Sequence, residues 1–451
     1  MYLGQKGLTI PKSLLSDAQQ KKIKKELTIT PKNIYQTLPP FYVYRESPNK
    51  LYVPRFYKTD NVPSQLPSGA EIQLTFTGQI RSTQQLAIDA FMENKCGLLQ
   101  LPCGFGKTIL ALYLISVLRK KTLVIVHKEF LMDQWIERIQ EFLPTARIGR
   151  IQGTTIDVTN KDIVLGMLQS LSTKTYPKEV FEDFGFTIID ETHHMGAEVF
   201  SNALFQIVTP YMLGLSATME RKDGMTKLFK MFLGEVVYSA QRETVENIIV
   251  QMIKYRCNDA EFNETILNFK GQANYSSMIK KLCEYNPRTE FIITVLIHLL
   301  KSDKRQIMIL AHNKSVLTYL YDAIQHRKLA SVGYYIGGMN PSDLKETESK
   351  QVVIATYAMA EEALDIKSLN TLIMASPKTD VTQAVGRILR EKHGQPIIVD
   401  IVDSHDTFIR QWAKRKKYYG SQHYNIVQST NTTYPVVEPL KERKAKCLIS
   451  D

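Results

Sequence analysis

The chain has 451 residues, 44% of them hydrophobic, and carries a formal net charge of +12 at neutral pH. This length predicts about three domains with substantial cores, and the charge favours a polyanionic partner over a merely basic protein with no such partner. The five cysteines contain no C-x-x-C pair, which argues against a zinc site or a disulfide framework.

No run of about 18 apolar residues occurs, and the first residues lack the apolar core of a signal peptide. Together with the unpaired cysteines, these features predict an intracellular protein in a reducing compartment, with no membrane partner. The sequence leaves nucleus, cytoplasm and virion open.

Residues 1–75 are rich in Lys, Pro and Tyr, and their short β-like runs at 41–44 and 51–53 are separated by prolines. We expect a small accessory module that contains strands. Its basic run at 21–25 is as compatible with a solvated charged face as with nucleic-acid contact.

Residues 76–240 alternate between strand-like and helix-like segments, which predicts an α/β domain with a parallel sheet and helices on both faces. One expected helix covers residues 129–142, where Leu131, Trp135 and Ile139 fall at helical spacing. The expected strands lie at 97–101, 122–126, 162–165, 184–189 and 211–215.

A glycine-rich turn follows the first of these strands. Residues 101–108 read L-P-C-G-F-G-K-T, and an apolar helix is expected from 108 to 118. The order strand, turn and helix is that of a phosphate-binding loop, whose helix N-terminus also favours an anion. Leu101 stands where that pattern usually has Gly, so an ordinary glycine-rich turn remains an alternative.

In this turn Gly104 and Gly106 permit a tight backbone, Lys107 supplies a positive charge and Thr108 supplies a hydroxyl for Mg²⁺. We therefore expect ATP phosphates to lie against the whole turn, which consists of Pro102, Cys103, Gly104, Phe105, Gly106, Lys107 and Thr108.

The strand at 184–189 runs directly into Asp190 and Glu191. We assign Asp190 to Mg²⁺, partly through water, and Glu191 to the attacking water. The alternative is a solvated acidic strand end. His193 follows this pair, and Ser216 and Thr218 directly follow the strand at 211–215. We expect these three residues to couple hydrolysis to the second domain. For the S-A-T segment, the N-cap of a helix is the alternative.

Residues 241–292 lack the alternation and are expected to connect two domains. A second α/β domain without a phosphate loop is expected over 293–428, followed by a polar, basic tail at 429–451. Its expected strands lie at 306–310, 332–336, 352–355, 371–374 and 396–402.

In the second domain, residues 383–390 read Q-A-V-G-R-I-L-R. On a helix Gln383, Arg387 and Arg390 share one face. An arginine that reaches a γ-phosphate across a cleft stabilises the transition state, so we expect catalytic roles for these three residues. A solvent-exposed polar face is the alternative.

Nucleic-acid contacts are expected at the strand ends of both domains, to phosphates and not to bases. The candidates are His127, Lys128, Arg150, Gln169, Ser170, His312, Asn313 and Lys314. Residues 410–419 mix cations with aromatics, which suits either base stacking or an amphipathic surface helix.

Over about residues 76–428, six motifs resemble, in the same order, those of superfamily 2 helicases of the DExH type. They are R-x-x-Q at 81–84, G-F-G-K-T, D-E-T-H, S-A-T, the run at 355–366 and Q-A-V-G-R-I-L-R. Residues 101–108, 127–135 and 219–224 are most similar to the branch that holds the XPB subunit, the phage helicase UvsW and the poxvirus transcript-release helicase.

The resemblance implies two RecA-like domains in tandem and ATP-driven movement on nucleic acid. It places Arg81 and Gln84 near ATP, with Gln84 near the adenine, and implies that Thr356 and Asp365 couple nucleic-acid contact to hydrolysis, with Asp365 also near the nucleotide. Ala363 replaces the family's usual Gly, and Lys222 replaces an acidic residue of the branch's R-E-D triplet, which puts a melting role of that triplet in doubt.

We therefore expect a monomeric, ATP- and Mg²⁺-dependent helicase with 3′–5′ polarity on single-stranded DNA or tailed duplexes, in transcription, repair or recombination. RNA, DNA–RNA hybrids and the transcription machinery are alternative or additional partners. The competing functions are a duplex translocase that does not separate strands, an RNA helicase, and an ATP-sensing scaffold without turnover.

Overall fold

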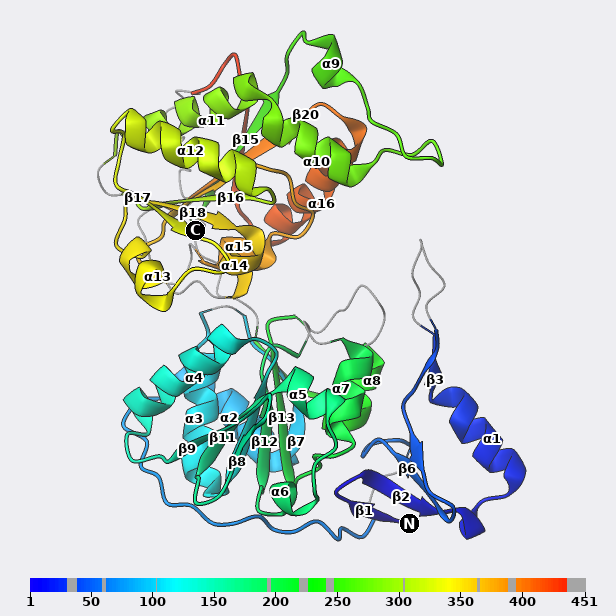
Figure 1. Cartoon of the computed structure of the whole chain (residues 1–451). Coiled ribbons are helices and arrows are strands. Elements are labelled where there is room, and N and C mark those ends of the chain that lie inside the picture. The colour runs from blue at the N-terminus through cyan, green and yellow to red at the C-terminus, as the bar shows by residue number, and fades with distance from the viewer. Residues whose placement is uncertain are drawn as a thin grey trace, which may run out of the picture. The chain divides into compact units, whose positions relative to one another are not determined.

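The computed structural model describes residues 1–30, 39–58, 62–102, 104–192, 196–218, 226–240, 247–302, 305–362, 366–387 and 395–435. The chain divides into two compact units, Met1–Arg242 and Glu243–Asp451, which we call the N-terminal and the C-terminal unit (Figure 1). Each is built around a mainly parallel sheet, which confirms the predicted fold class.

The main sheet of the N-terminal unit has the strand order β10-β9-β11-β8-β12-β13-β7-β14 among the described residues. Neighbouring strands are parallel, except that β10 is antiparallel to β9. The strands are β7 (Cys96–Gln100), β8 (Thr122–Val126), β9 (Ile148–Gln152), β10 (Thr155–Asp157), β11 (Ile163–Met167), β12 (Phe186–Ile189), β13 (Tyr211–Ser216) and β14 (Val236–Ser239).

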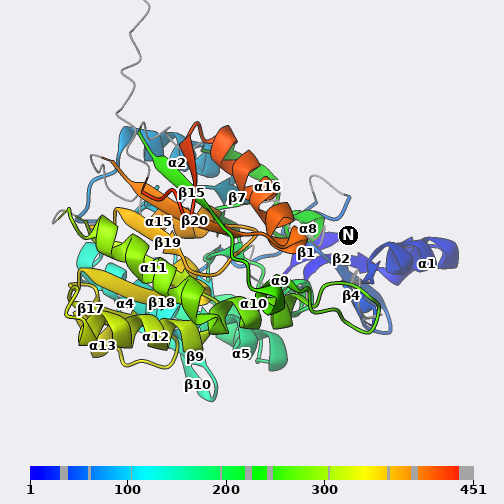
Figure 2. The same ribbon diagram turned by 90° about the horizontal axis from the view of Figure 1, so that it is seen from above.

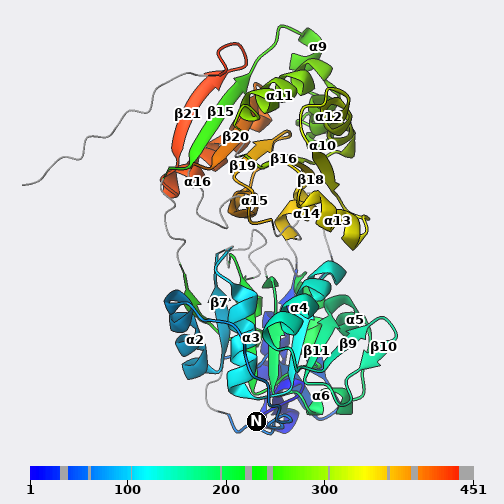
Figure 3. The same cartoon turned by 90° about the vertical axis from the view of Figure 1, so that its left-hand side faces the viewer.

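Helices cover both faces of this sheet because alternate strand residues point to opposite sides. In β8, Val124 and Val126 pack with α2 (Ser82–Asn94), α3 (Lys107–Leu118) and α4 (Glu129–Phe142). These three helices are labelled in Figure 3. Leu123 and Ile125 instead pack with α5 (Leu168–Thr173), α7 (Ala197–Leu204) and α8 (Thr226–Leu233). The short α6 (Glu179–Glu182) precedes β12.

The N-terminal segment folds as a small antiparallel sheet, β1-β2-β6-β5, with a separate β3-β4 pair. It packs onto the same unit: Arg55 Nη1 donates to the Thr209 carbonyl at 2.6 Å, and the Phe56 N–H donates to the Met231 carbonyl at 2.8 Å. Its elements are β1 (Tyr2–Gly4), β2 (Gly7–Pro11), η1 (Lys12–Leu14), α1 (Asp17–Glu26), β3 (Thr28–Ile29), β4 (Phe41–Tyr42), β5 (Arg45–Glu46) and β6 (Lys50–Val53).

The sheet of the C-terminal unit is parallel throughout its described part, in the order β17-β18-β16-β19-β20-β15-β21. Part of the segment expected to be a connection, residues 249–255, is a strand of this sheet beside β20 (Figure 2). The strands are β15 (Ile249–Tyr255), β16 (Ile307–Ala311), β17 (Val332–Tyr335), β18 (Val352–Thr356), β19 (Thr371–Met374), β20 (Ile397–Asp403) and β21 (Asn425–Thr430).

Two helical layers enclose this second sheet. One face packs against α9 (Ala260–Asn263), α10 (Tyr275–Glu284), α11 (Asn286–Leu299) and α12 (Lys314–His326). The remaining helices are α13 (Pro341–Thr347), α14 (Tyr357–Glu362), α15 (Thr382–Arg387) and α16 (Asp406–Ser421), of which α16 packs on the opposite face through a pair with Asp400. Within the described ranges, no helix is long and apolar enough to cross a membrane.

Candidate nucleotide and nucleic-acid site

The glycine-rich turn joins β7 to α3, as the sequence predicts. Gly104 and Gly106 adopt left-handed backbone angles, with φ of 82° and 84°. A Cβ atom on Gly106 would lie 2.6 Å from Gln84 Nε2 and 2.9 Å from Arg81 Nη2. The backbone conformation therefore favours glycine at 106, and a Cβ there would displace the side-chain ends of Gln84 and Arg81.

Arg81 and Gln84, at the start of α2, hold the backbone of this turn. The Arg81 guanidinium donates to the Phe105 carbonyl and, at 3.4 Å, to that of Gly104. The buried Gln84 amide donates to the carbonyls of Phe105 at 3.0 Å and Gly106 at 3.3 Å, and its oxygen accepts from the Arg81 N–H at 2.9 Å. The structure thus brings both residues to the turn.

Lys107 and Glu191 form an ion pair at the carboxyl ends of β7 and β12. The Lys107 Nζ atom lies 2.7 Å from Glu191 Oε1, and the side chains are only 13% and 22% exposed. Glu191 itself has a left-handed backbone with φ of 50°, an unfavourable conformation for a residue with a side chain. The predicted phosphate-binding cation and water-orienting carboxylate are therefore direct neighbours.

Asp190 is buried beside this pair. Its Oδ1 accepts from the Glu191 N–H and its Oδ2 accepts from the Trp135 indole N–H, both at 2.9 Å. Burial, followed by the nearby Glu191 charge, raises the pKa of Asp190 to about 6, against the opposing effects of Lys107 and the Trp135 hydrogen bond. A bound cation would stabilise the ionised form of this carboxyl.

The role of Trp135 was not predicted from the sequence. Its spacing on α4 indicated only a core residue, and it is indeed 2% exposed. A buried indole usually finds an acceptor for its N–H, and a buried carboxylate needs donors. These two requirements are the only signal that could have linked Trp135 to Asp190.

The S-A-T segment lies next to the turn. The Leu101 N–H donates to the Ser216 carbonyl at 2.8 Å, and the Ser216 hydroxyl donates to the Thr218 carbonyl at 2.5 Å. The Thr192 hydroxyl reaches the Leu215 carbonyl at 3.4 Å, which links the end of β12 to β13. The three strand ends that carry the candidate chemistry are thus connected.

The predicted nucleic-acid residues of the N-terminal unit divide into two groups. His127 and Lys128 follow β8, and the exposed Gln169 lies just after β11, all at the carboxyl edge of the sheet. The buried Ser170 hydroxyl instead accepts from the Gly153 N–H at 2.9 Å. Arg150 lies within β9, where its guanidinium is 3.7 Å from Asp133 Oδ1.

In the C-terminal unit, His312, Asn313 and Lys314 follow β16, and Thr356 ends β18. The His312 backbone N–H and its ring Nδ1 both contact the Ser376 hydroxyl at 2.9 Å. Partial burial and the Lys378 charge lower the pKa of His312 to about 4, so its ring carries no charge at neutral pH.

Gln383 and Arg387 lie on α15, whose described part is anchored by the buried Ala384 and Val385. The side chain of Arg387 is not among the described parts of the chain. Six further residues named from the sequence lie wholly outside the described residues, namely Cys103, His193, Lys222, Ala363, Asp365 and Arg390.

The stretch at 410–419 corresponds to the amphipathic alternative. Trp412, Arg415 and Tyr419 on α16 are buried, with exposures of 8%, 1% and 0%, and they face the sheet. Trp412 and Tyr419 therefore cannot stack on bases, whereas Tyr418 is only partly buried. The outward face of the helix still carries cations, namely Arg410, Lys414, Lys416 and Lys417.

Comparisons with known proteins extend over nearly the whole chain. A family described as "Type III restriction enzyme, res subunit" matches residues 77–221. "Putative ATP-dependent RNA helicase L396" of Acanthamoeba polyphaga mimivirus is 35% identical over 97% of this chain and 87% of its own length. "Putative helicase 161L" of Invertebrate iridescent virus 6 is 27% identical over 79% of this chain and 84% of its own length.

Among solved structures, S. cerevisiae Dbp5 bound to RNA and ADP BeF3 has a TM-score of 0.57, with 12% sequence identity over 79% of this chain and 92% of that one. At this identity the likeness concerns the fold alone, that of two tandem domains with parallel sheets.

Proposed function

Because this chain belongs to the superfamily 2 helicases, an ATP-dependent family that works on nucleic acid, we propose that it moves 3′ to 5′ along DNA and separates strands. The observation that carries the ATPase part is the convergence of Lys107, Asp190 and Glu191 at the carboxyl edge of the sheet, beyond β7 and β12. An ATP-sensing scaffold would have no need for Glu191 in this place.

The site fits ATP with Mg²⁺. A Cβ on Gly106 would meet the side chains of Gln84 and Arg81 that hold the turn, and Lys107 stands at the start of α3, where an anion is favoured. Thr108 and the buried Asp190 would hold Mg²⁺, directly or through water. When bound, Mg²⁺ neutralises charge on the phosphate oxygens.

Lys107 and Glu191 have complementary tasks. A phosphate that attracts the Lys107 ammonium competes with the Glu191 carboxylate, which now lies 2.7 Å from it. Once released, Glu191 can accept a hydrogen bond from water and orient it for attack. The pair therefore ties the availability of the carboxylate to the presence of the nucleotide.

DNA is the track that the resemblance to the XPB, UvsW and poxvirus branch favours, and transcription or repair is the setting that it suggests. RNA is the second candidate, because the mimivirus relative is named an RNA helicase. The net charge of +12 supports binding to either polymer through its phosphates.

A strand-displacement assay tests the proposal. We expect the full chain to displace a labelled strand from a DNA duplex with a 3′ single-stranded tail, and to act poorly on a 5′-tailed duplex or an RNA duplex. Lys107→Ala is the inactive control. Equal unwinding of RNA and DNA, or a preference for 5′ tails, would contradict the proposed track, whereas ATP-driven translocation without displacement would favour a duplex translocase.

A further inference from the structure

The segment 375–378, which begins the connection between β19 and α15, is held by side chains at each of its residues. Each of its four carbonyl oxygens accepts a hydrogen bond from a different helix. The donors are Arg288 Nη1 to Ala375 at 2.6 Å, the Tyr357 hydroxyl to Ser376 at 2.6 Å, the Tyr275 hydroxyl to Pro377 at 3.2 Å and Arg415 Nη1 to Lys378 at 2.6 Å. We call this set of bonds the carbonyl clamp.

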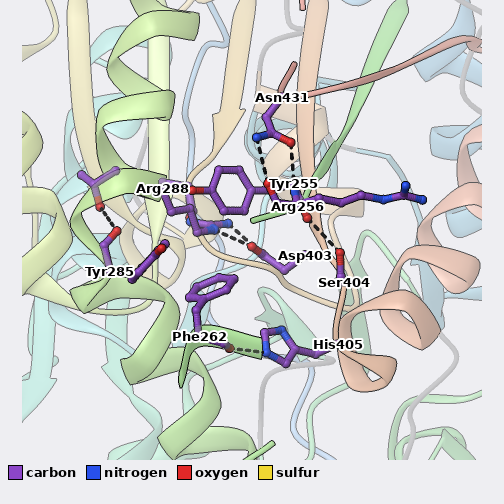
Figure 4. A network of polar contacts seen from close by, with 11 residues as sticks. Tyr255, Arg256, Phe262, Tyr285, Arg288, Asp403, Ser404, His405 and Asn431 are labelled. Carbon is purple, nitrogen blue, oxygen red and sulfur yellow. Dashed lines mark hydrogen bonds and ion pairs between the residues drawn. The ribbon is translucent and has the colours of Figure 1, made fainter. Parts of the chain in front are cut away.

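The two arginines of the clamp are fixed by β20. Arg288 makes a bidentate pair with Asp403, at 2.6 and 2.9 Å, and both side chains are 0% exposed (Figure 4). Arg415 pairs in the same way with Asp400, at 2.7 and 2.8 Å. Because the two aspartates are three residues apart on one strand, they face opposite sides of the sheet, and the arginines approach from α11 and α16.

Stability alone does not explain this arrangement. Buried ion pairs cost desolvation energy, and apolar residues of similar size often replace them without loss of stability. Arg288 and Arg415 each use two donors for an aspartate and a third for a carbonyl of the same connection. Two such residues at the ends of a four-residue segment restrict its movement in a way that apolar packing would not.

The same connection touches the predicted nucleic-acid loop. The Ser376 hydroxyl contacts both the His312 N–H and the His312 ring at 2.9 Å, and Ser376 is fully buried. On its other side the segment leads into α15, which starts at Thr382 and carries Gln383 and Arg387. Residues 375–378 therefore lie between the loop at 312–314 and the helix with the predicted arginine finger.

We propose that residues 375–378 form a fixed mount that positions α15 for ATP hydrolysis and links it, through Ser376, to the loop at 312–314. Tyr275, Tyr357, Arg288 and Arg415 are thus positioning residues, which act through the connection. The inference rests on the proposed function, since it assigns hydrolysis to α15 and nucleic-acid contact to the loop.

The first test removes only hydroxyl groups. Tyr275→Phe with Tyr357→Phe should lower the DNA-stimulated kcat by about tenfold or more, because small misplacements of catalytic groups are costly. KM for ATP and Tm should match those of Tyr319→Phe, a control in the same unit that loses a 2.6 Å bond to Glu290. A kcat equal to that of the control overturns the proposal, as does a loss that appears only with a larger fall in Tm.

The second test concerns Ser376. Ser376→Ala removes the oxygen that His312 contacts and leaves the carbonyl in place. We expect the ratio of stimulated to basal ATPase rate, measured with a single-stranded DNA oligonucleotide, to fall about tenfold relative to the control. The control is Ser404→Ala, which loses a 3.0 Å bond to the Tyr255 carbonyl in the same unit. An unchanged ratio contradicts the link.

Measurements on the wild-type protein distinguish a failure of the proposed function from a failure of the mount. If DNA does not stimulate its ATPase, the proposed function fails. If DNA stimulates the wild type and all the variants equally, only the mount is refuted.

Discussion

The Lys107 ammonium lies 2.7 Å from the Glu191 carboxylate, so the two residues expected to act on the γ-phosphate and on water hold each other. Both remain partly exposed, and their attraction is therefore moderated by solvent. An incoming phosphate can compete for the lysine. Because the two residues would then act on different partners, single substitutions can distinguish their roles.

Lys107→Ala and Glu191→Gln should both abolish turnover, for different reasons. The first removes the cation and should also weaken ATP binding. The second keeps the shape of the side chain but removes the charge that orients water, so ATP binding should persist. Steady-state ATPase and ATP titrations distinguish the two, and turnover of Glu191→Gln close to wild type would refute its assignment.

Trp135 should be required for the metal site. Trp135→Phe removes the 2.9 Å hydrogen bond to Asp190 and replaces the indole with a smaller ring, a loss of buried volume that Trp412→Phe shares. Loss of a partner that orients a metal ligand typically costs about 10- to 100-fold in metal affinity, so the Mg²⁺ concentration for half-maximal ATPase should rise by that factor. Trp412→Phe on α16 is the control, and equal Mg²⁺ dependence of both variants would contradict the role.

Gly106→Ala should impair ATP binding through steric conflict and not only through backbone strain. The new Cβ would lie 2.6 Å from Gln84 Nε2, in addition to the strain of φ at 84°. Gly271→Ala, in the other unit, with φ of 70° and nothing within 4 Å of the added atom, is the control for the effect of backbone strain on stability. We expect ATP affinity to fall about tenfold or more only in Gly106→Ala, since a steric conflict in the turn displaces the groups that bind phosphate. Equal affinities would show that the turn tolerates the Cβ.

His312 should make stability dependent on pH. Its folded pKa of about 4 lies below the ordinary value of 6.5, so the unfolded chain binds more protons between these values and stability falls as pH decreases through them. His312→Gln loses this dependence. The difference in Tm between wild type and variant should therefore be largest near pH 7 and shrink towards pH 4.5; a constant difference would show that the histidine titrates normally.

Elements with strong local signals were predicted closely from the sequence. The strand at 122–126 and the helix at 129–142 have the bounds that we expected, because an apolar run and a helical spacing are read directly from neighbouring residues. The strand β15 lies in the region that was expected to be a connection, part extended and part helical, and its place in the sheet was not predicted. Its residues I-V-Q-M-I-K-Y include two polar side chains, and its partner β20 lies about 150 residues further along the chain. Strand pairing over such distances leaves no local trace.

In the candidate site, too, local motifs were predicted from the sequence and partners distant in the sequence were not. The glycine-rich turn and the pair at 190–191 are contiguous motifs, and the structure brings Lys107 and Glu191 together as their chemistry requires. The bond from Trp135 to Asp190 spans 55 residues, and the pair of Arg288 with Asp403 spans 115. These partners depend on burial and on the order of strands, which no single motif contains.

The most direct test of the central claim is the ATPase rate of the intact protein, with and without a single-stranded DNA oligonucleotide, alongside Glu191→Gln. Without DNA, we expect the wild type to hydrolyse ATP slowly. At saturating DNA its rate should rise about tenfold or more, because catalytic groups must be brought into position. Glu191→Gln should hydrolyse ATP under neither condition. A wild-type rate that does not respond to DNA or to RNA would contradict a nucleic-acid-driven motor.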